Sequence, residues 1–330
     1  MSFPTSRRPL GMATAAPALV ALVLGASGCM DYTIETTLEA DGTGVRVERM
    51  EITRSDASNL SERDVRALTA SSREKEWRTS HRVESDGDTT WVLERRSDVR
   101  TLRDWSDPAR RTLILGTVPA KAEDRLGYVR LGDVAFRSSI QVGVSRRSDG
   151  TSLVSYRESF LWDQAVDAIV EFLVQDLDRA LSERYPRLSA GERGSVVGFA
   201  RARIWVAGEE GLFFGENEAE AVARAAEGTA EQAVKIVRVR YPEASVDELR
   251  TLVVERLDME DEQLGRLFEQ TLPGLNLGFN TTVVFRLTLP GAVGATNASS
   301  RDGNVLEWQF NPLDNLMAPL EVFAESVVGG

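Results

Sequence analysis

The stretch Met30–Ile52, MDYTIETTLEADGTGVRVERMEI, has the pattern of two β-strands joined by a tight turn. Apolar and polar residues alternate over 32–38, which is the period of a half-buried strand. The segment Asp41-Gly42-Thr43-Gly44 contains residues that tolerate left-handed turn conformations. The return strand is marked by Val45, Val47 and Ile52. We therefore predict that the folded domain begins with a β-hairpin.

Further strand signals occur at both ends of the chain. Asp86-Gly87 and Asp149-Gly150 each lie beside β-favouring segments, so they predict two more hairpins in the N-terminal third. Ser61-Glu62-Arg63-Asp64 has the pattern of a helix start and predicts one helix that runs to about Trp77. Strand patterns return late in the sequence, at 281–289, 305–310 and 320–323.

The segment between these two sets of strands is helical in pattern. Between Val166 and Leu181 apolar residues recur at the i, i+3, i+4 spacing of a core-facing helix. Capping patterns at Ser189–Glu192 and Ser245–Glu248 predict further helix starts. Acidic residues outnumber basic ones over 209–272, so the exposed faces of these helices are expected to be negative.

The fold class that follows is α+β, an antiparallel sheet formed by N- and C-terminal strands with an inserted helical subdomain. The late strands are too few to bury a face of their own, so they are expected to complete the N-terminal sheet. The predicted organisation is a signal peptide at 1–28, an N-terminal sheet with one helix at 29–161, an acidic helical insertion at 162–272 and C-terminal strands at 273–330.

The first thirty residues have the layout of an export signal. Arg7 and Arg8 precede an apolar stretch from Leu10 to Leu24, which ends in small residues. The motif Ala26-Ser27-Gly28-Cys29 resembles the lipobox of bacterial lipoproteins, with alanine in place of the commoner leucine. This resemblance implies cleavage between Gly28 and Cys29 and acylation of Cys29. The competing interpretation is an uncleaved N-terminal transmembrane helix.

Cys29 is the single cysteine among 330 residues, which excludes an intramolecular disulfide and agrees with a role as an anchor. The net charge of −12 becomes −14 once residues 1–28 are removed. Such a charge argues against nucleic acid as a partner and against electrostatic adhesion to anionic lipid. N-terminal acyl groups such as palmitate are therefore the expected membrane attachment.

The C-terminal sequence shows a further resemblance to bacterial lipoproteins. Leu289-Pro290-Gly291-Ala292-Val293, Thr296-Asn297-Ala298 and Gly303-Asn304-Val305-Leu306-Glu307-Trp308 resemble the closing hairpin of LppM-like envelope lipoproteins. The resemblance covers about Cys29–Ile52 and Asn280–Phe323. It implies that the Asp41-Gly42 hairpin shares one sheet with the strand before Pro290-Gly291 and with the strand that carries Trp308. It also implies a hydrophobic ligand or an envelope protein as partner, and it brings no catalytic residues.

The sequence contains no recognisable motif for catalysis or metal binding. His81 is the one histidine, and neither a Gly-x-Ser-x-Gly elbow nor a His and Cys ligand set accompanies it. The carboxylates at Asp258–Glu262 lack the spacing of a calcium loop. We therefore predict no cofactor, no bound metal and no enzymatic activity.

Two apolar stretches outside regular periodicity are the candidate interface. They lie at 211–215 and 272–279, although buried packing of these loops against the sheet is the favoured alternative. The candidate interface residues are Leu212, Phe213, Phe214, Leu275, Leu277 and Phe279.

The leading functional prediction is a non-enzymatic envelope lipoprotein that binds a protein or a hydrophobic ligand. The alternatives are a hydrolase of envelope polymer that uses a carboxylate pair and a structural subunit of a membrane-associated assembly. The expected location is the outer side of the cytoplasmic membrane or the outer membrane, because Met30 replaces the aspartate that retains some lipoproteins at the inner membrane.

Overall fold

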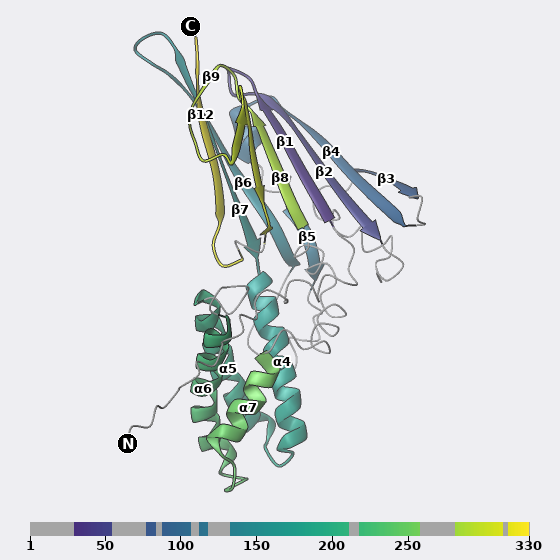
Figure 1. Ribbon diagram of the computed structural model, residues 1–330, viewed down its shortest axis with the longest axis vertical. Helices are drawn as coiled ribbons and strands as arrows, with labels where there is room; N and C mark the ends of the chain where they lie inside the picture. The colour runs from purple at the N-terminus through teal and green to yellow at the C-terminus, as the bar shows by residue number, and fades with distance from the viewer. Residues whose placement is uncertain are drawn as a thin grey trace, which may run out of the picture.

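The structure of this protein is a computed structural model, shown in Figure 1. It describes most of the chain after the predicted signal peptide. The described residues are 30–54, 77–83, 88–106, 112–117, 133–210, 218–257, 281–312 and 316–329.

Two β-sheets form one end of the molecule. The first is seven-stranded with the order β10-β11-β8-β1-β2-β4-β3, and the second is five-stranded with the order β5-β6-β7-β12-β9. Both sheets therefore combine strands from the two ends of the chain. The strands of the seven-stranded sheet are β1 (Met30–Leu38), β2 (Gly44–Arg54), β3 (Trp77–Val83), β4 (Thr89–Val99), β8 (Thr281–Thr288), β10 (Ser300–Asp302) and β11 (Val305–Phe310). Those of the five-stranded sheet are β5 (Thr112–Thr117), β6 (Asp133–Arg146), β7 (Ser152–Asp163), β9 (Ala292–Thr296) and β12 (Leu320–Val328).

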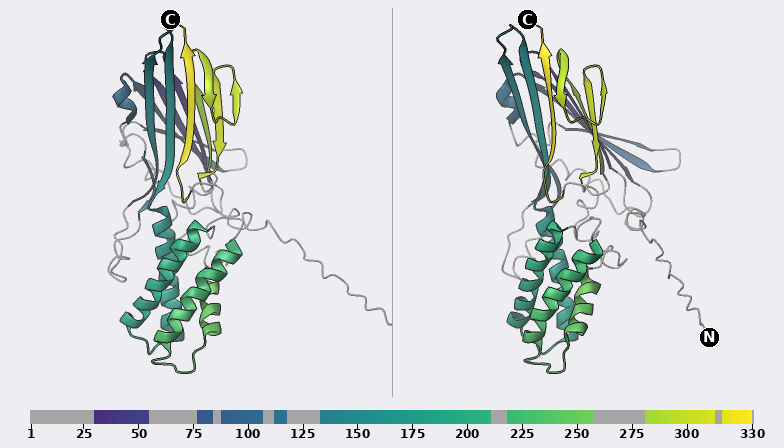
Figure 2. Two further views of the ribbon diagram at one scale, coloured as in Figure 1. Left: turned by 90° about the vertical axis from the view of Figure 1, so that its left-hand side faces the viewer. Right: turned by 60° about the vertical axis from the view of Figure 1, so that its left-hand side comes forward.

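The two sheets lie against each other, and their inner faces form the core. Inward-facing side chains such as Ile34, Met50, Tyr156 and Phe285 are buried there. In the left view of Figure 2, β6, β7 and β12 lie in front and the seven-stranded sheet lies behind them. Among the described residues, side chains on the outer faces, such as Asp31 and Arg157, are exposed.

The helices form a separate bundle at one end of the sheets, as Figures 1 and 2 show. Each helix contacts its neighbours in sequence, and the last also contacts the first, which closes a four-helix arrangement. Buried alanines on one side of α6, from Ala221 to Ala233, allow close approach of the neighbouring helices. The helices are α4 (Ala165–Arg184), α5 (Ala190–Glu209), α6 (Glu218–Val237) and α7 (Val246–Leu257).

A single residue connects the long strand β7 to the bundle. Gln164 is the N-cap of α4 and has a φ of 60°, the one positive φ of a non-glycine residue among the described parts of the chain. Such a conformation is uncommon for residues with a side chain and changes the chain direction within one position. The bundle therefore leaves the sheet without an intervening loop.

Several local predictions are confirmed. Gly42, Gly150 and Gly291 all have positive φ in turns that connect successive strands. Gly42 is also closely packed, because a Cβ there would lie 2.5 Å from Leu102 Cδ2. Ser189 and Glu192 form the predicted capping box, and the Glu248 amide donates to Ser245 Oγ over 3.1 Å.

The α+β class and the helical insertion between strands are confirmed, while the sheet differs from the prediction in two respects. There are two sheets instead of one, and β1 pairs with β8 in parallel, with Met30 opposite Thr281. A parallel pair needs a long connection, and the chain between β1 and β8 includes the whole bundle, so the topology permits it. The helix expected to reach about Trp77 falls in residues that the structure does not describe, except that Trp77 itself begins β3.

The strand arrangement implied by the family resemblance is confirmed. The order β11-β8-β1-β2 places the first hairpin, the strand before Pro290-Gly291 and the strand with Trp308 in one sheet. The domain boundaries at 29, 162 and 273 stay predictions, although β7 continues through Trp162 to Asp163 and the first helix of the bundle starts at Ala165.

Candidate functional site

The outer face of the seven-stranded sheet contains a polar hollow. Along β1, Tyr32 and Ile34 point into the core, so Asp31, Thr33 and Glu35 point outward. The same alternation applies to β2, β4 and β8. The hollow has a volume of about 520 Å³ and is lined by Asp31, Thr33, Glu35, Val47, Arg49, Glu51, Glu94, Thr282, Val284 and Arg286.

Ion pairs cross the strands on this face. Arg286 on β8 lies 2.8 Å from Glu307 and 3.3 Å from Glu35. Hydrogen bonding to Glu307, and then to Glu35, raises the pKa of Arg286. Arg49 lies 2.6 Å from Glu51 on the same strand. Exposed pairs of this kind contribute little to stability, so they can be exchanged for contacts with a partner at small cost.

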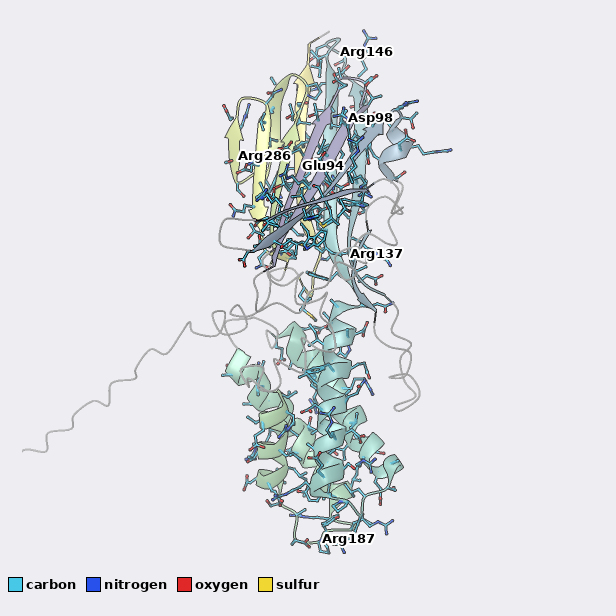
Figure 3. All side chains as sticks on the ribbon, turned by 90° about the vertical axis from the view of Figure 1, so that its right-hand side faces the viewer. Glu94, Asp98, Arg137, Arg146, Arg187 and Arg286 are labelled. Atoms are coloured by element: carbon cyan, nitrogen blue, oxygen red, sulfur yellow. The ribbon has the colours of Figure 1, made fainter. Side chains whose placement is uncertain are left out.

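Two carboxylates in the hollow lie outside the ion pairs among the described residues. Asp31 and Glu94 form no ion pair with any other residue that the structure describes. Figure 3 shows Glu94 and Arg286 in the sheet portion of the molecule, away from the helices. With four carboxylates against two guanidinium groups, the lining has an excess of negative charge.

Directly beneath this face lies a buried network of charged side chains between the sheets. Its members are Arg46 and Glu48 on β2, Arg95 on β4 and Glu158 on β7, each at most 3% exposed. Two arginines and two glutamates leave the network neutral. Because burying an unpaired charge is very costly, this balance is what permits four ionised groups in the core.

Arg46 joins the two sheets through a bidentate pair. Its Nη1 donates to Glu158 Oε2 over 3.0 Å and its Nη2 donates to Glu158 Oε1 over 2.9 Å. The Tyr156 hydroxyl also donates to Glu158, over 2.6 Å. Since β2 and β7 belong to different sheets, these bonds fix how the sheets face each other.

The second pair lies within the seven-stranded sheet. Arg95 Nε donates to Glu48 Oε2 over 2.8 Å, and the Tyr32 hydroxyl donates to Glu48 Oε1 over 2.7 Å. Burial would raise the pKa of Glu48, but the charges of Arg46 and Arg95 outweigh it and lower the pKa. Burial, and then the negative charge of Glu48, raises the pKa of Tyr32 well above its ordinary value.

Within the described parts of the chain, the guanidinium groups are not fully hydrogen-bonded. Arg46 Nε and Arg95 Nη1 have no hydrogen-bond partner among these residues, although Arg46 Nε lies 3.6 Å from Glu48 Oε1. The Arg95 guanidinium lies over the Trp77 ring, 4.7 Å from its centroid, where a cation–π interaction compensates in part. The four charged groups pair with one another and are buried, so we assign the network a structural role. The hollow on the outer face is the candidate site.

The residues singled out from the sequence lie elsewhere. Gly28, Cys29, the carboxylates at 258–262 and the six candidate interface residues (Leu212, Phe213, Phe214, Leu275, Leu277 and Phe279) all fall outside the described residues, so these assignments stay predictions. His81 is exposed on β3, with its ring 5.1 Å from that of Trp91.

Sequence reasoning missed both the hollow and the network, yet one signal was present. In β2 the apolar residues Val45 and Val47 fall on odd positions, while Met50 and Ile52 fall on even ones. Between Val45 and Ile52, each face of this strand combines two apolar residues with two charged ones, so whichever face turned inward would bury charged side chains. The structure places Met50 and Ile52 inward, together with Arg46 and Glu48.

Comparisons with known proteins give one distant structural likeness. No protein-family model matches the sequence, and no curated protein matches it. The NMR structure of the folded domain of LppM from Mycobacterium tuberculosis aligns over 92% of this chain and 93% of that domain, at 9% sequence identity and a TM-score of 0.28. At these values the likeness assigns neither residues nor activity to this chain. None of the described helices is long and apolar enough to cross a bilayer.

Proposed function

We propose that this protein is a lipid-anchored, non-enzymatic binding protein of the bacterial cell envelope, attached through Cys29. We further propose that the hollow on the seven-stranded sheet binds a protein partner with a basic surface. The main support for protein binding is the hollow itself. Its polar lining comes from four strands and has an excess of negative charge, which complements a basic surface.

The start of β1 supports the anchoring half of the proposal. Met30, the residue after Cys29, is 2% exposed and pairs with Ile52 on one side and Thr281 on the other. Asp31, the next residue, already lines the hollow. Because consecutive Cα atoms are about 3.8 Å apart, an acyl group on Cys29 would be attached one residue before the sheet begins.

The polar lining favours a protein over a hydrophobic ligand at this position. An apolar ligand gains affinity by burying apolar surface, and only Val47 and Val284 offer such surface in the lining. A protein with lysine or arginine side chains can pair with Asp31 and Glu94 instead. A hydrophobic ligand at another part of the molecule, a hydrolase and a structural subunit stay predictions from the sequence.

Replacement of Cys29 by serine tests the anchor. We expect the wild-type chain in the membrane fraction with an N-terminal peptide that begins at acylated Cys29, and the Cys29→Ser variant in the soluble fraction. No other thiol exists to confuse the result. Mass spectrometry of the N-terminal peptide and fractionation supply the two measurements. An unmodified peptide that still contains residues 1–28 would show that the anchor is wrong.

Charge reversal in the hollow tests the binding surface. In the double variant Asp31→Lys/Glu94→Lys, like charges would face a basic partner, so we expect the yield of the partner cross-linked in intact cells to fall about tenfold. Asp302→Lys on β10 makes the same kind of change at an exposed position outside the hollow, and it should leave the yield unchanged. If the double variant and the control give equal yields, this face is not the binding surface.

A further inference from the structure

The outer face of the five-stranded sheet has a hollow of its own, on the side opposite the charged face. Its volume is about 360 Å³, near the lower end of small-molecule sites, which span about 300–1,000 Å³. Strands β6, β7 and β12 form it. Its lining residues are Gln141, Val142, Gly143, Ser155, Tyr156, Arg157, Phe323, Ala324 and Glu325.

The missing side chain of Gly143 opens the floor of this hollow. Gly143 lies in the interior of β6 opposite Ser155, on the outward-facing side of the strand. A Cβ added there would lie 2.7 Å from Ser155 Oγ, so a side chain would occupy the hollow. Glycine weakens a strand interior, and its presence often marks a place where a ligand or another backbone approaches closely.

The walls combine an aromatic ring with hydrogen-bonding groups. Phe323 is half-buried and lies opposite Arg157, on the outward side of β12. Glu325, two positions further, forms no ion pair with any residue in the described ranges, and it lies opposite Ser155. Gln141 adds an exposed amide group from β6. One guanidinium and one carboxylate leave the lining without net charge.

These features restrict the class of ligand. At the hollow, β7 is paired on both sides, with β6 and with β12, so its backbone groups are engaged in the ladders and cannot add the strand of a peptide. The described pairing of β6 with β5 ends at Arg137, before the lining residues. The side chains over β7 are therefore the groups that would hold a ligand in the middle of the hollow. A sugar ring has C–H groups that pack on an aromatic face, and its hydroxyls both donate and accept hydrogen bonds. Neutral charge in the lining agrees with a neutral sugar.

We propose that this hollow is a binding site for a neutral saccharide, with Phe323 under the sugar ring and Gln141, Ser155 and Glu325 bound to its hydroxyls. The site uses other residues than the protein-binding face and does not depend on Cys29. A failure of either proposal therefore leaves the other unaffected.

The test uses the purified full chain and four disaccharides, namely maltose, cellobiose, mannobiose and N,N′-diacetylchitobiose. Saturation-transfer NMR detects which of them binds, and isothermal titration calorimetry measures the dissociation constant. We expect at least one to bind with a dissociation constant of about 1 mM, a binding free energy of about −4 kcal/mol. If none of the four binds, the proposal is overturned.

Three variants locate the site. Gly143→Thr fills the floor and should abolish binding, yet it should keep or raise the melting temperature because β-branched residues favour strands. Phe323→Ala should weaken binding about tenfold. Val305→Thr on β11 changes a residue of the other sheet that lines neither hollow, and it should leave binding unchanged. If the folded Gly143→Thr variant binds as tightly as the wild type, the sugar binds elsewhere and the assignment is wrong.

Discussion

Replacement of Glu158 by glutamine is expected to lower the free energy of unfolding by about 3–5 kcal/mol. Glutamine keeps the shape of the side chain and can still accept from the Tyr156 hydroxyl, but it removes the charge that faces Arg46. Arg46 is 3% exposed, so its guanidinium cannot turn to solvent. Its other acidic neighbour, Glu48, already accepts hydrogen bonds from Arg95 and Tyr32. Urea denaturation of the full chain, followed by tryptophan fluorescence, measures the loss.

A second variant separates the cost of leaving the Arg46 charge buried without a counter-charge from the loss of its contact with Glu158. In Arg46→Met/Glu158→Gln the remaining pair, Glu48 and Arg95, is neutral, so the double variant should be more stable than Glu158→Gln alone. An exposed pair provides the control. Glu321→Gln removes the 3.3 Å pair with Arg157 and should cost at most about 1 kcal/mol. Equal losses for Glu158→Gln and Glu321→Gln would contradict the assigned role of the network.

Local features were predictable from the sequence because they depend on neighbouring residues. The turns at Gly42, Gly150 and Gly291 need positive φ, which glycine adopts at little cost, and the stripe from Val166 to Leu181 is buried as its periodicity indicates. The capping box of Ser189 is likewise a local hydrogen-bond pattern. None of these depends on the position of a distant strand.

Features that depend on distant strands were not predictable in this way. Arg46 and Glu158 are 112 positions apart, and neither sequence neighbourhood indicates that the two will meet. The division into two sheets has the same origin, because Pro290-Gly291 connects β8 in one sheet to β9 in the other. The hollow around Gly143 also requires β12 to lie beside β7, a pairing between strands more than 150 residues apart.

Truncation of Phe285 to alanine tests this long-range arrangement and should cost about 3–5 kcal/mol of unfolding free energy. The ring is fully buried on β8, the strand that joins the N-terminal hairpin to β11. Its centroid lies 5.9 Å from that of Tyr156 in the other sheet and 5.3 Å from that of Trp308 on β11. Removing it therefore leaves a cavity where both sheets and both ends of the chain meet.

Two variants make the Phe285 result specific. Phe285→Leu keeps most of the volume and should cost clearly less than alanine, because the cavity is smaller. Val284→Ala alters the adjacent residue of the same strand, which faces the outer hollow, and should change stability by only about 0.5–1 kcal/mol. The ranking of the three variants in denaturant midpoint depends on which face of β8 points inward. A greater loss for Val284→Ala than for Phe285→Ala would mean that β8 presents its other face to the core, and the register between β8 and β1 would then have to shift by one residue.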